Sequence, residues 1–148
     1  MVTIQVVGRR QWQEAVAGGS QENNMEQGYK DLKVFQLAYK LAREIFEITK
    51  SFPKEETYSL TDQIRRSSRS VCVNIGEGYR KRKYSKHFSS KMTDADGECT
   101  ETQIWIDFSK DCNYITKETH ERLYKEYEEV GRMLGSMANN PGKFLPKN

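Results

Sequence analysis

Apolar residues recur three or four positions apart in four stretches of this chain, and this spacing predicts four amphipathic helices. The first helix is expected over residues 32–51, because Asp31 is a favourable N-cap and Pro53 prevents the helix from continuing. The second is expected to start at Ser59, whose side chain would cap the first turn, and to weaken towards Gly78. These start and stop residues fix the expected boundaries.

Two longer periodic stretches complete the pattern. The third helix is expected over residues 85–111, where Gly97 costs about 1 kcal/mol relative to Ala unless close packing requires a glycine. The fourth is expected to begin near Thr116 and to end at residues 139–142. Four amphipathic helices joined by short turns predict an all-α protein, an antiparallel up-down four-helix bundle. The expected core residues, helix by helix, are Val34, Leu37, Ala38, Leu41, Ile45 and Ile48; Leu60, Ile64, Ser68, Val71 and Ile75; Phe88, Met92, Ala95, Cys99, Thr102 and Ile106; and Leu123, Tyr127, Val130, Leu134 and Met137.

The two ends of the chain differ from this periodic region. A run of small and polar residues precedes the first helix, so residues 1–28 are predicted to be a disordered N-terminal appendage, 29–140 the bundle domain and 141–148 a C-terminal tail. No stretch reaches the roughly 18 consecutive apolar residues that span a bilayer. Arg9 and Arg10 follow the first apolar residues rather than precede them, which is not the layout of a signal peptide. We therefore expect a cytoplasmic protein with no membrane partner.

Residues that support catalysis or metal binding are sparse. Cys72, Cys99 and Cys112 are too far apart for a zinc site and odd in number for a disulfide framework, so free thiols are expected. No Glu has a His three positions later, as di-iron bundles require, and His87 and His120 fall in different helices. A lone G-x-G motif ends a helix instead of opening one, unlike a phosphate loop. The sequence predicts no catalytic site, no metal and no cofactor.

Four aromatic residues lie off the apolar stripes. On helical geometry, Tyr39 and Phe46 lie away from the stripe of the first helix, and Trp105 and Phe108 lie away from that of the third. One stripe per helix is enough for a bundle, so additional aromatics indicate a second buried surface. They are predicted to form the subunit interface of a homo-oligomer. The alternative is that these large side chains only flank the core.

The strongest local feature is electrostatic. The whole chain has a formal net charge of +3. Residues 65–86 hold eight basic residues against the single acid Glu77, a net charge of +7, whereas the other 16 basic and 20 acidic residues sum to −4. Three of the arginines are expected to project opposite the apolar stripe of their helix, towards solvent or a partner. The eight basic residues are Arg65, Arg66, Arg69, Arg80, Lys81, Arg82, Lys83 and Lys86.

Such a cluster is typical of non-specific nucleic-acid binding, because affinity follows the number of phosphates neutralised. Tyr79 and Tyr84 bracket the densest part of the cluster and offer surfaces on which bases stack. The sequence therefore predicts binding of RNA or DNA. One alternative is a solvated basic face that neighbouring Glu residues neutralise. Another is a scaffold or adaptor whose outer aromatics and basic patch bind a protein partner.

Several sequence blocks, in order, resemble the "four helix bundle protein" family, also called S23 or 23S rRNA-intervening-sequence proteins. The resemblance extends from Tyr29 to Asn139 and is specific, because the whole ordered series matches. The matching blocks are YKDLKVFQLA from residue 29, SFPKEE from 51, QIRRSS from 63, VNIGEGY from 73, GECTETQ from 97 and NYI from 113.

The resemblance implies a four-helix bundle that assembles as a ring-shaped homopentamer. Some members are encoded within inserted segments of ribosomal RNA genes, and most have no established function. The similar accessory protein of diversity-generating retroelements is a basic pentamer that binds nucleic acid and a reverse transcriptase. By the same resemblance, the residues of this chain that match the family's central motif are Arg65, Arg66, Asn74, Glu77 and Gly78.

The chain also departs from the family. Gly76 stands where Ala is usual, and the run from Arg80 to Lys83 is more basic than in many members. The third helix is more acidic, with Asp94, Asp96 and Glu98, which argues against a uniformly basic ring.

Overall fold

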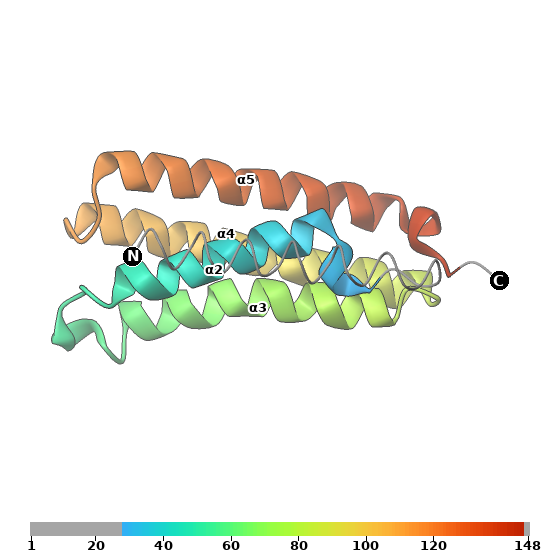
Figure 1. Cartoon of the computed structure of the whole chain (residues 1–148), viewed down its shortest axis with the longest axis horizontal. Helices are drawn as coiled ribbons and strands as arrows, with labels where there is room; N and C mark the ends of the chain where they lie inside the picture. The colour runs from blue at the N-terminus through green and yellow to red at the C-terminus, as the bar shows by residue number, and fades with distance from the viewer. Residues whose placement is uncertain (1–27, 147–148) are drawn as a thin grey trace.

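The computed structural model describes residues 28–146, which form an antiparallel four-helix bundle (Figure 1). The helices are α2 (Lys33–Thr49), α3 (Leu60–Arg80), α4 (Ser85–Asp111) and α5 (Lys117–Asn139). Short 3-10 turns precede α2, connect α2 to α3, and follow α5; they are η1 (Tyr29–Asp31), η2 (Lys54–Glu56) and η3 (Pro141–Phe144). The described residues contain no strand, and the prediction of an all-α four-helix bundle is confirmed. Except for Gly28, the expected N-terminal appendage lies outside the described residues.

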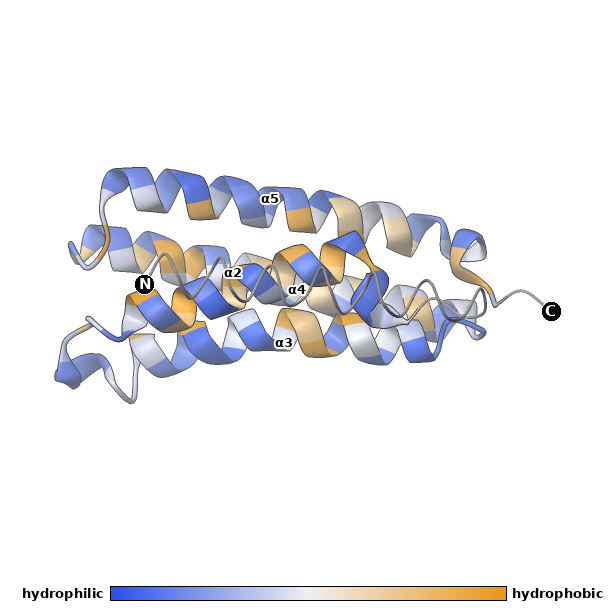
Figure 2. Cartoon of the chain, viewed as in Figure 1, coloured by the Kyte–Doolittle hydropathy of each residue, from blue (hydrophilic) through white to orange (hydrophobic). Residues whose placement is uncertain are grey.

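The core lies where the four apolar stripes meet. Helix α2 packs against α3 and α5, and α4 packs against the same two helices from the opposite corner. Hydrophobic positions recur at intervals along each helix between hydrophilic ones (Figure 2). All predicted core residues of α3, α4 and α5 are buried, so these stripes are confirmed. In α2, Leu37 and Ile48 are only half-buried, and Phe35 and Ala42 are buried in addition.

Helices α3 and α4 approach each other closely because small residues line their contact. The hydroxyl of Thr102 donates to that of Ser67 across the interface at 2.8 Å, and both residues are fully buried. Near the end of α3, a Cβ atom at position 78 would lie 2.7 Å from the Cβ of Lys91, a distance that real side chains do not reach. The helix passes both glycines and ends at Arg80, and Gly78 permits the close approach of α4.

Both predicted helix caps differ from expectation. The carboxylate of Asp31 accepts from the backbone N–H of Gly28 within its own 3-10 turn, so Leu32, and not Asp31, is the N-cap of α2. Ser59 is the N-cap of α3, but its hydroxyl donates to the carboxylate of Glu56 at 2.5 Å instead of capping the turn. Thr116, near which the fourth helix is expected to begin, is the N-cap of α5 and accepts from the N–H of Thr119 at 3.1 Å.

Polar contacts and the C-terminal turn complete the packing. On the side where α2 meets α5, Arg122 forms two hydrogen bonds with the buried carboxylate of Glu44. Removal of either partner would leave a buried charge or hydrogen-bonding group uncompensated, so this pair holds the two helices in register. Turn η3 folds back on the bundle, and the ring of Phe144 stacks on that of Phe88 with centroids 5.2 Å apart. Among the described residues, no helix has the length and apolar character to cross a bilayer.

Candidate nucleic-acid interface

The eight predicted basic residues fall into two separate groups. Arg65, Arg66 and Arg69 lie in the first half of α3, whereas the other five lie at its end, in the turn to α4 and in the first turn of α4. With a rise of 1.5 Å per residue, about 20 Å of helix separates Arg66 from Arg80. The sequence cluster is therefore not one continuous surface.

Arg65 is part of the contact between α2 and α3. Its Nε donates to the hydroxyl of Thr49 at 2.7 Å, and its guanidinium lies 4.7 Å from the ring centroid of Phe46. A second guanidinium N–H points to the backbone carbonyl of Phe46 at 3.5 Å, at the C-terminal end of α2, where a cation is favourable. The expectation that Arg65 faces solvent or a partner is wrong, because the side chain reaches sideways to the neighbouring helix.

Arg66 and Arg69 are exposed, but both have partners within the chain. Arg66 approaches the carboxylate of Glu101 on α4 at 3.3 Å and also donates to Gln63. Arg69 places its guanidinium 5.5 Å from the ring centroid of Phe46. The alternative of neutralisation by a neighbouring Glu therefore holds for Arg66.

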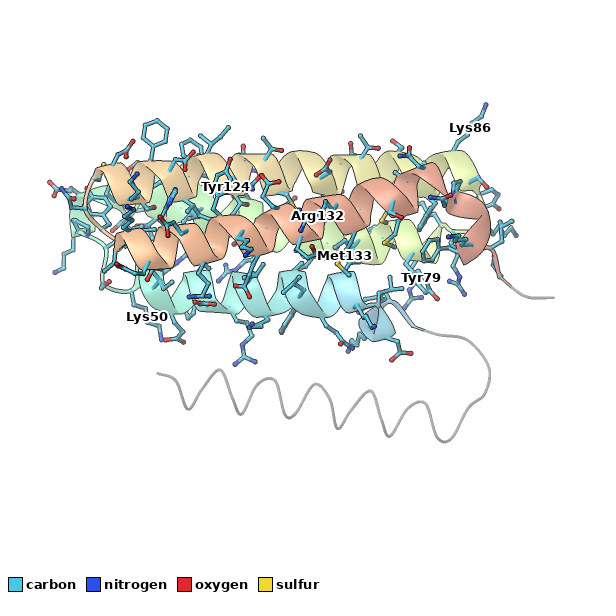
Figure 3. All side chains as sticks on the ribbon, turned by 90° about the horizontal axis from the view of Figure 1, so that it is seen from above. Lys50, Tyr79, Lys86, Tyr124, Arg132 and Met133 are labelled. Atoms are coloured by element: carbon cyan, nitrogen blue, oxygen red, sulfur yellow. The ribbon has the colours of Figure 1, made fainter. Side chains whose placement is uncertain are left out.

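The second group is not neutralised. Within residues 28–146, none of its five cations lies within ion-pair distance of a carboxylate. Arg82 is half-buried, with its guanidinium 4.2 Å from the ring centroid of Tyr79 and an N–H donated to the Tyr79 carbonyl. Lys86 extends away from the bundle, at the end opposite to Lys50 (Figure 3). The members of this group are Arg80, Lys81, Arg82, Lys83 and Lys86.

A further lysine from a distant part of the sequence joins this group. Turn η3 packs against α4, so the exposed Lys143 lies at the same end of the bundle. The sequence pattern gives no sign of Lys143, because only the docking of Phe144 on Phe88 brings it there. We call the five cations of the second group, together with Lys143, the basic end.

The start of α4 adds to the positive potential of the basic end. The first turn of α4 contains no acidic residue, and the N-cap Tyr84 provides no side-chain cap. The first N–H groups of any helix lack partners within the helix and carry partial positive charge. Cations beside such a terminus repel one another and favour a bound anion.

The two tyrosines that bracket the cluster differ in accessibility. Tyr79 is buried at 6% exposure, and Arg82 lies over its ring. Tyr84 is 55% exposed, with the ammonium of Lys83 5.2 Å from its ring centroid. Only Tyr84 of this pair therefore offers a surface for stacking.

The central motif of α3 forms a contact with α4. The aliphatic part of Lys91 packs over Gly78, and its ammonium lies 3.5 Å from Oδ1 of Asn74 and 3.8 Å from the carboxylate of Glu77. Asn74 is itself held by Nδ2, which donates to the carbonyl and hydroxyl of Ser70. These motif residues position Lys91 across the helix pair, a structural role.

The aromatics predicted for a subunit interface line two different grooves. Tyr39 and Phe46 border a groove of about 440 Å³ between α2 and α3, together with Val73, which is 56% exposed. Phe46 is not bare, because the ammonium of Lys50 and the guanidinium of Arg65 lie near its ring.

The second pair of aromatics lies near the C-terminal end of α4, far from the basic end. Trp105 and Phe108 border a groove of about 430 Å³ between α3 and α4, beside the fully exposed Tyr58. Ile104 and Phe108 are both about half exposed on the outer face of α4. Hydrophobic periodicity does not point to Tyr58 or Ile104, because Tyr58 lies in the connection between α2 and α3 and Ile104 lies off the apolar stripe of α4.

The thiols are free, and two of them are deeply buried. Cys72 and Cys99 are buried, whereas Cys112 is exposed. Burial raises the pKa of the Cys72 thiol to about 12, and burial followed by the nearby Asp96 raises the pKa of Cys99 further. At neutral pH these groups are protonated and therefore poor nucleophiles.

The remaining titratable groups are dispersed. His87 lies at the start of α4, and His120 lies at the far end of the bundle with its Nε2 2.7 Å from Asp107. Burial, and then the neighbouring Glu101, raise the pKa of Glu98 on α4. The part of the chain that the structure describes contains no group of three His, Cys, Asp or Glu residues that could hold a metal ion.

Comparison with known proteins identifies the family of the chain and solved structures with a similar fold. Residues 30–136 match the model of the 23S rRNA-intervening sequence protein family. The fold is similar to the 1.70 Å crystal structure of a protein of unknown function from the S23 ribosomal protein family of Bacteroides thetaiotaomicron VPI-5482. The two chains are 25% identical with a TM-score of 0.64, and the match covers 72% of this chain and 95% of the other. No curated protein matches the chain.

Proposed function

The chain belongs to the 23S rRNA-intervening sequence protein family, and from this premise we propose that it is a non-catalytic homo-oligomer that binds RNA or DNA through the basic end. The observation that carries the proposal is that, within residues 28–146, the five cations between Arg80 and Lys86 have no carboxylate partner. Unpaired cations on one surface attract a polyanion, and each phosphate contact releases condensed counterions. A non-catalytic role is supported by the protonated, buried thiols and by the two histidines at opposite ends of the bundle.

The charge-based part of this proposal is tested by removing four cations together. The variant R80A/K81A/R82A/K83A should bind a labelled oligonucleotide at least about tenfold more weakly near 50 mM salt, with a smaller slope of log K against log salt. Fluorescence anisotropy at several salt concentrations measures both quantities. Thermal melting of each variant verifies that the bundle is intact.

A matched control separates the basic end from total charge. The variant K54A/K110A/K117A/K125A also removes four exposed lysines, all from the rest of the bundle, and changes the net charge equally. It should retain most of the affinity and the slope of the parent protein. Equal losses in the two variants would mean that overall charge, and not the basic end, determines binding.

We also propose that the two aromatic grooves mediate assembly into a ring. A ring needs two unlike surfaces on each subunit, because each copy contacts its neighbours in a head-to-tail manner. The groove with Tyr39 and Phe46 and the groove with Trp105 and Phe108 lie on different faces around α3, which supports this arrangement. Light scattering should give a mass of several subunits, and Phe108→Glu should reduce it towards the 17.3 kDa of one chain.

A protein-binding adaptor is the second candidate, and the exposed aromatic side chains of Tyr58 and Phe108 favour it. The two functions differ in their dependence on nucleic acid. A partner protein that stays bound after nuclease treatment, and that Phe108→Glu releases while the quadruple alanine variant retains it, would support the adaptor. Loss of all partners on nuclease treatment would argue against it.

A further inference from the structure

We propose that the basic end selects single-stranded nucleic acid, with one base stacked on Tyr84 while the surrounding cations contact the adjacent phosphates. This inference rests on the proposed function of the same site and specifies the form of nucleic acid that it takes. It derives from the position of one aromatic ring among the unpaired cations.

Tyr84 is placed at the centre of the basic end. It lies in the turn between α3 and α4, with Lys83 before it and Lys86 two positions after it. More than half of its surface is open to solvent, at 55% exposure. A single exposed aromatic is common on protein surfaces, so it is the position of Tyr84 beside the cations Lys83 and Lys86 that makes its ring a candidate for stacking with a base.

The backbone of Tyr84 is ordered, and one aromatic neighbour lies beside its ring. Its N–H donates to the carbonyl of Lys81 at 2.8 Å, and its own carbonyl accepts from the N–H of Phe88 at 2.9 Å. The ring of His87 lies edge-on to it, with centroids 6.1 Å apart and an interplanar angle of 83°. A ring carried on an ordered backbone loses less conformational entropy when a base stacks on it than one on a mobile segment.

Among the aromatics of the described chain that are more than half exposed, only Tyr84 lies among the cations of the basic end. Tyr79 is buried beneath Arg82, so it cannot receive a base. Tyr58 and Phe108 are exposed, but both line the groove at the end of the bundle where Glu56 also lies. A polyanion is therefore directed to Tyr84.

The same geometry discriminates between single and double strands. In a duplex each base face is covered by its neighbours, so a protein ring gains stacking only where bases are unstacked. Phosphate contacts alone do not sense whether the bases are accessible, so they do not separate a single strand from a duplex in this way. Stacking is worth about 1–3 kcal/mol per base, so one ring changes affinity at least about fivefold.

The test compares a single strand with a duplex of the same sequence, in RNA and in DNA versions, using the full chain. Tyr84→Leu keeps an apolar side chain but removes the stacking face, and should weaken single-strand binding at least about fivefold without changing duplex binding. Tyr84→Phe should bind within about twofold of the parent protein, because a phenyl ring still stacks. Tyr58→Leu is the control for loss of an exposed tyrosine elsewhere.

The outcomes separate this inference from the proposed function. If R80A/K81A/R82A/K83A weakens binding but Tyr84→Leu does not, or if the duplex binds more tightly than the single strand, the basic end binds nucleic acid and the stacking site is wrong. If neither form binds the parent protein at low salt, the proposed function fails and the stacking site fails with it. A single strand containing 2-aminopurine gives an independent readout, since its fluorescence should fall on binding to the parent protein and not to Tyr84→Leu.

Discussion

Gly78 on α3 lies directly against Lys91 on α4, so close that a Cβ atom at position 78 would come within 2.7 Å of the Lys91 Cβ. The side chain of Lys91 passes over the bare glycine and brings its ammonium towards Asn74 and Glu77. The motif residues Asn74, Glu77 and Gly78 thus belong to one helix–helix contact. Lys91 therefore supports the α3–α4 packing and is not counted among the cations available to a phosphate.

This contact predicts opposite effects of alanine at two neighbouring glycines. Gly78→Ala should lower the free energy of unfolding by about 1–3 kcal/mol, because α3 and α4 must separate to admit the methyl group. Gly76→Ala should raise it by about 0.5–1 kcal/mol, since its Cβ would meet only the ring of Tyr29 at an ordinary 3.6 Å and alanine favours the helix. Urea denaturation of both variants measures the difference. A Gly78→Ala variant as stable as Gly76→Ala would show that the two helices are not in close contact there.

The two groups of predicted cations should respond differently to mutation. Arg65→Ala should lower the free energy of unfolding by about 1–2 kcal/mol, because it removes the charged hydrogen bond to Thr49 and the packing on Phe46. Arg69→Ala, at an exposed position beside the same ring, should change it by less than about 0.5 kcal/mol. Oligonucleotide affinity of Arg65→Ala should stay close to that of the parent protein. A large loss of affinity with unchanged stability would instead indicate that Arg65 is part of the binding surface.

The sequence predicts the fold of α3, α4 and α5 well because their apolar residues keep a strict helical period, from Leu60 to Met137. The predictions that fail have a common cause, because each concerns a side chain that contacts a neighbouring helix or turn. A helical projection places Arg65 opposite the core by the angle of its Cα, but a long side chain reaches the neighbouring helix. The cap expected from Ser59 fails in the same way, because Glu56 in the preceding turn takes its hydroxyl.

Only the part of the candidate site that is local in sequence is predicted, because tertiary contacts determine the rest. The run from Arg80 to Lys83 stays together because it is local in sequence, whereas Arg66 is separated from it by the length of α3. Lys143 joins the basic end only through the docking of η3, and the burial of Tyr79 depends on tertiary packing. Sequence spacing gives no information on any of these three facts.

Glu56 and Tyr114 predict a pH dependence of stability. The carboxylate of Glu56 accepts from the hydroxyls of Ser59 and Tyr114, which lower its pKa below the ordinary 4.5. Its contribution is therefore complete above about pH 4.5 and is lost as the pH falls through the lowered pKa. The bond to Glu56 raises the pKa of Tyr114 to about 12, so that contribution is complete below pH 10.0 and is lost as the pH rises towards 12.

Tyr114→Phe should remove the alkaline part of this dependence and reduce the acid part, because Ser59 still donates to Glu56 in the variant. The difference in free energy of unfolding between the parent protein and the variant should be greatest from about pH 5 to 9 and should shrink in acid below pH 4.5 and in alkali above pH 10.0. Denaturant titrations at several pH values measure it. A difference that stays constant across the range would mean that the two groups are not hydrogen-bonded in solution.

Replacement of Tyr127 by Phe is expected to affect stability in the opposite way from Tyr114→Phe. Its side chain is fully buried, burial raises its pKa well above 10.0, and no described residue accepts or donates a hydrogen bond at its hydroxyl. A buried polar group without a partner costs about 1–3 kcal/mol relative to a bonded one, so Tyr127→Phe should leave stability unchanged or raise it by about 1 kcal/mol. Tyr114→Phe, which removes a bonded hydroxyl, is the matched control and should lower stability at neutral pH. If Tyr127→Phe lowers the free energy of unfolding as much as Tyr114→Phe does, the Tyr127 hydroxyl is hydrogen-bonded in solution, and the centre of the bundle is more polar than its packing indicates.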